Sequence, residues 1–77
     1  MADLHPHQRR VVDEKAELDG RLNRLTAFIA DPVFQTVGAD EADRLLKQHA
    51  LMSQLSEVLG QRINAFIQSA AVLPKGN

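Results

Sequence analysis

The chain has 77 residues, which allow at most one domain, and its formal net charge of −1 argues against a general nucleic-acid binder. Hydrophobic residues make up 44% of the chain and aromatic residues only 4%, so we expect an aliphatic core; the absence of cysteine excludes disulfides and thiolate metal sites. No apolar run reaches the roughly 18 residues of a membrane span, so we expect a cytoplasmic protein without a membrane or cofactor requirement.

Residues 1–6 are predicted to form an N-terminal arm, and a helix is predicted from about His7 to Ala30. Pro6 can occupy the first turn of this helix, where its missing N–H costs nothing. Apolar residues of the predicted helix recur at spacings of three and four, which is typical of helices that pack along a seam. These residues are Val11, Leu18, Leu22, Leu25 and Ile29, and Leu4 in the arm continues the same spacing.

The connection is predicted to contain a short helical turn. A residue before proline avoids helical angles, so Asp31 should end the first helix and cap the new turn, with Pro32 at its first position. Val33, Phe34 and Val37 should fold over the end of the hairpin. Gly38 is predicted to stop the turn in the left-handed conformation.

A second helix is predicted from Asp40, as its N-cap, to about Ala71, followed by a tail at 72–77. Its seam repeats the apolar pattern of the first helix. These residues are Leu45, Met52, Leu59, Ile63, Phe66 and Ala70. Together the two patterns predict an all-α, antiparallel two-helix hairpin over residues 7–71.

Self-association is predicted for two reasons. One seam leaves at least half of each helix exposed to water. Folded chains below about 80 residues are also only marginally stable unless a metal, a disulfide or oligomerisation stabilises them. The second helix also carries apolar residues beside or beyond its seam. They form the predicted oligomer interface of a homodimer or larger bundle: Leu46, Leu51, Leu55, Val58 and Ile67.

Lys15 occupies a seam position where an apolar residue is expected, and antiparallel alignment places it near Ser56. One interpretation is a polar layer that sets the register of the two helices. The other is an anion-binding lysine in an oligomer cleft. His49, also on the seam, should be a hydrogen-bonded core histidine; the alternative is a pH-sensitive layer.

The free end of the hairpin is predicted to be locally basic, since His7, Arg9 and Arg10 begin the first helix and Arg62 lies on the returning one. The functional interpretation is a site for an acidic partner surface or a phosphate-bearing ligand. The alternative is a solvated helix end with pairs four residues apart, such as Arg10 with Glu14. His5 and His7 lack a clustered third ligand, so no metal site is predicted.

Two stretches carry a resemblance to a known family. One is the His-x-x-Arg-Val-x-x-Glu opening at 7–14, with a Phe-Ile pair at 28–29; the other is Gln-x-x-x-Met at 48–52, with Leu59 and an Arg-Ile pair at 62–63. Over about residues 5–67 the chain resembles small helical-hairpin proteins of tailed bacteriophages, first catalogued from a crAss-like gut phage. Leu55 departs from that pattern, in which an aromatic residue is expected. The resemblance implies a phage-encoded accessory protein that acts in the host cytoplasm by binding.

No Gly-rich phosphate loop or nucleophile triad is present in the sequence, so we do not expect an enzyme. We expect the chain to self-associate and to act by stoichiometric binding to a host regulatory or defence protein. One alternative is an oligomeric sponge for a signalling nucleotide, and another is a structural coiled-coil adaptor of the virion.

Overall fold

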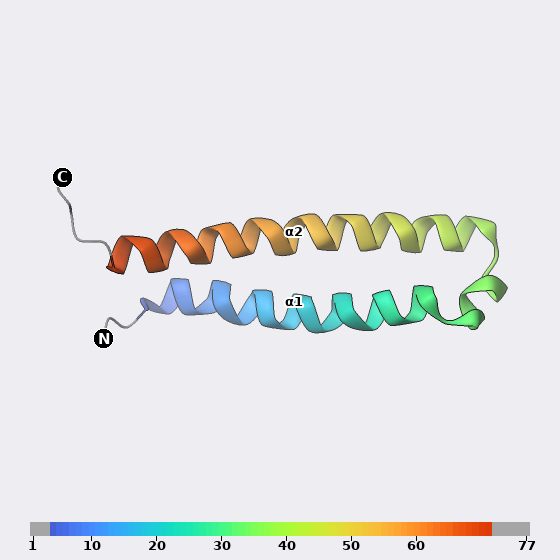
Figure 1. Ribbon diagram of the computed structural model, residues 1–77, viewed down its shortest axis with the longest axis horizontal. Helices are drawn as coiled ribbons and strands as arrows, with labels where there is room; N and C mark the ends of the chain where they lie inside the picture. Colours follow the sequence, from blue (N-terminus) through green and yellow to red (C-terminus); the bar gives the residue numbers. More distant parts are fainter. Residues whose placement is uncertain (1–3, 72–77) are drawn as a thin grey trace.

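The computed structural model describes residues 4–71, with side chains described up to residue 68. It contains the helices α1 (Pro6–Ala30) and α2 (Ala39–Ala71), joined by a 3₁₀ turn, η1 (Pro32–Thr36). The two helices run antiparallel with η1 at the closed end of the hairpin, and the start of α1 lies beside the last turns of α2 (Figure 1). The all-helical prediction is confirmed, and the predicted tail at 72–77 lies outside the described residues.

Helix α1 begins at Pro6, one residue earlier than predicted, and Pro6 occupies its first turn as expected. The backbone N–H of His5 donates to Gln8 Oε1 at 2.9 Å, and the His5 carbonyl accepts from the N–H groups of Gln8 and Arg9 at 2.9 Å each. These contacts satisfy backbone groups that the first turn of a helix leaves without partners.

The connection forms as predicted at both of its ends. Asp31 is extended, with ψ 144°, and its carboxylate accepts from the Val33 N–H at 2.9 Å, so it caps η1. Phe34 packs edge-on against Phe28 with ring centroids 6.1 Å apart, whereas Val33 remains 46% exposed. Gly38 has a φ of 93°, in the left-handed region that glycine adopts without strain.

The predicted N-cap of α2 is wrong by two positions. The Gly38 carbonyl accepts from the Ala42 N–H at 2.9 Å, so the first helical hydrogen bond starts at Gly38 and the helix begins at Ala39. Asp40 therefore lies within the first turn, where it and Glu41 still favour the positive end of the helix. The physical reason is that the reversal at Gly38 already points the chain along α2.

The core is a thin line of side chains between the helices. Val11, Leu18 and Leu59 are the buried hydrophobic residues, and Met52, Ile63 and Phe66 pack against them while remaining partly exposed. All six come from the predicted seams. The hairpin measures 56 × 21 × 17 Å, so it is too narrow to bury more than one line of side chains from each helix.

Candidate functional site

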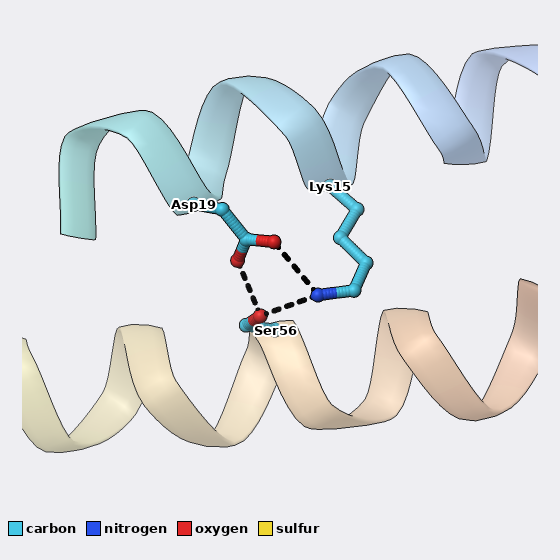
Figure 2. A network of polar contacts seen from close by, with 3 residues as sticks. All are labelled: Lys15, Asp19 and Ser56. Atoms are coloured by element: carbon cyan, nitrogen blue, oxygen red, sulfur yellow. Dashed lines mark hydrogen bonds and ion pairs between the residues drawn. The ribbon is translucent and has the colours of Figure 1, made fainter. Parts of the chain in front are cut away.

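A polar network interrupts the apolar seam at mid-length (Figure 2). Lys15 Nζ lies 2.8 Å from Asp19 Oδ2 and 2.9 Å from Ser56 Oγ, and the Ser56 hydroxyl donates to the other carboxylate oxygen of Asp19. The three side chains thus close a ring of hydrogen bonds between α1 and α2. The predicted proximity of Lys15 to Ser56 is confirmed.

The ring uses much of the hydrogen-bonding capacity of Lys15. Two of the three ammonium donors are engaged within the protein, and the side chain is only 28% exposed. The hydrogen bond from Lys15, followed by that from Ser56, lowers the pKa of Asp19 below its ordinary value of 3.8. This geometry favours the register-setting interpretation of Lys15 over the anion-binding one.

Gly60 provides the space for the stem of Lys15. A Cβ atom added at Gly60 would lie 3.3 Å from Lys15 Cε, closer than side chains normally pack. The lysine stem therefore crosses α2 over a residue without a side chain and reaches Ser56 one turn earlier. A second polar contact follows toward the closed end, where Thr26 Oγ1 and His49 Nε2 are 2.8 Å apart. His49 is hydrogen-bonded as predicted, but it is partly exposed and does not belong to the core.

The free end of the hairpin carries the predicted basic residues. His7, Arg9 and Arg10 are exposed on the first turns of α1, and Arg62 is exposed on α2. Lys15 on α1 contacts Ser56 on α2. Arg9 lies six residues before Lys15 and Arg62 lies six residues after Ser56, so the two arginines are at the same level along the hairpin, near its free end. The structure thus brings the cationic residues of the two helices to one end.

These cationic residues form no ion pairs within residues 4–68. The ion pair on α1 is Lys15–Asp19, so the predicted pairing of Arg10 with Glu14 is wrong. The Asp19 carboxylate binds the Lys15 ammonium group in the partly buried seam. Arg10 and Glu14 are instead exposed to solvent, where ion pairs contribute little to stability. The rings of His5 and His7 are stacked, with centroids 5.7 Å apart. In the described part of the chain, no group of three or more potential ligands could hold a metal ion.

The exposed apolar residues of α2 fall on two different flanks of the seam. At about 100° per residue, Leu51, Leu55 and Val58 share one flank, which we call the leucine stripe. Leu46 and Ile67 lie on the opposite flank, the side on which Ser56 and Gly60 meet Lys15. The predicted interface of five residues is thus two separate surfaces. Arg62 continues the leucine stripe four positions after Val58.

Sequence reasoning missed two residues of the polar contacts, Asp19 and Thr26. The spacing of Lys15 and Asp19 by four residues could have indicated the first. No signal marked Thr26, because its partner His49 comes from the other helix. Among the described residues, neither helix is long and apolar enough to cross a membrane.

The sequence is similar to a known protein family and to a bacteriophage protein. A family model described as Sequestin matches residues 5–65, which include both helices, the polar network and the basic free end. An uncharacterized 7.5 kDa protein from the denB-rIIB intergenic region of Enterobacteria phage T4 is 37% identical over 60 residues, which cover 78% of this chain and 94% of that protein. No solved structure matches the chain.

Proposed function

Because the chain belongs to the Sequestin family, we propose that it is a phage-encoded accessory protein that holds its target by stoichiometric binding, without catalysis. The family name, which refers to sequestration, and a relative from a bacteriophage both support this proposal. The preferred target is a host regulatory or defence protein, bound in the host cytoplasm. We also propose that the chain is related to the helical-hairpin proteins of crAss-like phages.

The observation that carries the proposal is the exposed surface of the free end. Arg9, Arg10 and Arg62 gather there from two helices, and none of them forms an ion pair within residues 4–68. Arginine presents forked donors that match carboxylates and phosphates. The surface therefore suits an acidic target.

The test compares charge reversals at the two ends of the same helix face. Arg62→Glu, combined with Arg10→Glu, should abolish capture of the target from host lysate and leave the helical circular dichroism unchanged. Arg44→Glu is the matched control, since Arg44 lies five helical turns from Arg62 on the same face and pairs with Glu41 at 2.9 Å. Equal capture by all variants would contradict a role for the free end.

A second candidate target is a signalling nucleotide. The family name is compatible with such a sponge, and the same arginines supply donors for phosphate groups. Lys15 is a weaker candidate for this role, because Asp19 and Ser56 already bind its ammonium group. A thermal shift with cyclic nucleotides that is lost in the Arg10 and Arg62 variants would favour the sponge, and a flat response would count against it.

A structural adaptor within the virion is the remaining alternative. Detection of the protein in purified phage particles at a fixed copy number would favour the adaptor. Its absence from the particles would remove this alternative and leave the two binding functions.

A further inference from the structure

The leucine stripe is an apolar surface that the described hairpin leaves uncovered. Leu51 is 66% exposed, Val58 48% and Leu55 43%, although they are regularly spaced on one helix flank. Met52 and Phe66 lie beside the stripe at the edge of the seam and are only partly buried. A surface of this kind normally packs against another element.

We propose that the stripe binds a second copy of this chain, with α2 packed antiparallel on α2 of that copy and a twofold axis near Leu55. The stripe lies at the centre of the helix, because Leu55 is the midpoint of Ala39–Ala71. A twofold axis there brings Leu55 against its own copy and places Leu51 within one residue, about 1.5 Å along the helix, of the level of Val58 of the second copy. The surface is therefore complementary to itself, as a twofold interface requires.

The charges of α2 favour the antiparallel orientation. Arg44 and Arg62 bound the stripe on the same flank, and Lys47, one turn before Leu51, lies at its margin and pairs with Asp43 at 3.3 Å. A parallel pair would place each arginine beside its own copy and would bring together the acidic first turns, which contain Asp40 and Glu41. In the antiparallel pair, Arg62 comes level with Gln48 and Arg44 with Phe66, and the helix dipoles oppose each other.

The size of the core points to a second copy rather than to an unrelated partner. The described hairpin buries three hydrophobic residues, and the chain contains no cysteine that could supply a disulfide. Chains of this length are usually stabilised by association when disulfides and metals are absent. Two hairpins joined through the stripe would form a four-helix bundle with a continuous core.

The same geometry determines where the candidate binding ends would lie. In an antiparallel pair, the two basic free ends are at opposite ends of the bundle. The interface leaves Arg9 and Arg10 of each copy accessible on α1. The inference therefore holds whatever the protein binds, and it predicts two equivalent sites for each pair of chains.

The test uses single-cysteine variants, which the cysteine-free chain makes unambiguous. Under mild oxidation, Leu55→Cys should form a disulfide-linked dimer with itself, and Leu51→Cys should link to Val58→Cys in a mixture in preference to itself. The control is Leu46→Cys, which is 49% exposed but lies on the opposite flank and should not cross-link. Retained helical circular dichroism verifies that each variant folds.

Each outcome of this experiment decides the proposal. Preferential linking of Leu51→Cys to itself would overturn the antiparallel orientation. Linking of Leu46→Cys, without linking of Leu55→Cys, would overturn the choice of flank. Light scattering of the unmodified protein should give an even multiple of 8.5 kDa at micromolar concentration, and a monomer would overturn the interface altogether.

Discussion

At the scale of single residues, the polar network explains how a lysine can lie on an apolar seam. Its stem fills the space above Gly60, and its ammonium group is bound by Asp19 and Ser56. A polar layer of this kind stabilises little by itself but penalises other registers, because a shifted helix would leave these groups without partners.

Stability should depend on pH through Asp19. Its pKa is lowered in the folded protein, so the carboxylate contributes stability above its ordinary pKa of 3.8, and this contribution is lost as the pH falls through the lower folded value. Urea denaturation of the unmodified protein and of Asp19→Asn checks this. The difference between their urea midpoints should have its largest value at pH 7 and should decrease as the pH falls below 4.

A difference that is constant over this pH range would contradict the pairing of Asp19 with Lys15. Asp13→Asn is a suitable control, because Asp13 is exposed on α1 and takes no part in the network. Its midpoint should follow that of the unmodified protein at every pH.

Two helical glycines should respond differently to alanine. Gly20→Ala should raise the free energy of unfolding by roughly 0.5 to 1 kcal/mol, since alanine is the better helix former. Its nearest neighbour would be Arg24 Nη1 at 3.7 Å, an ordinary contact. Gly60→Ala should gain less, because the new methyl group would press on Lys15 Cε at 3.3 Å. Urea denaturation measures both, and an equal gain would show that the lysine stem does not need this space.

At the scale of elements, the chain reversal depends on Asp31, Pro32 and Gly38. Pro32 ends α1 by restricting the residue before it, the Asp31 carboxylate caps η1, and Gly38 turns the chain into α2. Each of these effects is local, which explains why the sequence predicted the connection closely. The error at Asp40 arose because either Gly38 or Asp40 could have started the helix, and only the backbone path distinguishes them.

Gly38→Ala should destabilise the hairpin by about 1 to 2 kcal/mol, because a φ of 93° is strained for any residue with a Cβ atom. No atom lies within 4 Å of the added methyl group, so the cost would come from the backbone alone. Gly38→Asn should recover part of the loss, since asparagine tolerates the left-handed region. Thermal unfolding of the three proteins tests this, and an unchanged alanine variant would contradict the strain.

At the scale of the whole molecule, the described hairpin leaves more large apolar residues exposed than it fully buries. Its seam contributes three buried residues, whereas five large apolar residues of α2 remain exposed on two flanks. The proposed pairing covers one flank and leaves Leu46 and Ile67 on the other. That second flank lies beside the polar network, so it differs in chemistry from the leucine stripe.

The midpoint of thermal unfolding should therefore rise with protein concentration, since association stabilises only the folded chain. We expect a clear increase between about 5 and 500 μM, measured by circular dichroism. Leu55→Lys should lower the midpoint and remove most of this dependence, because it places charges near the proposed axis. A sharp transition that is independent of concentration in the unmodified protein would contradict association.

The sequence by itself determined the two helices, their seams, the turn between them and the position of Lys15 opposite Ser56. These features depend on periodicity and on local backbone preferences, which are written into short stretches of chain. Only the tertiary structure decided that Gly60 makes room for the stem of Lys15, that Thr26 meets His49, and which apolar residues of α2 stay exposed. Those features depend on the rotation of one helix against the other, which side-chain packing sets and which the sequence pattern of either helix alone leaves undetermined.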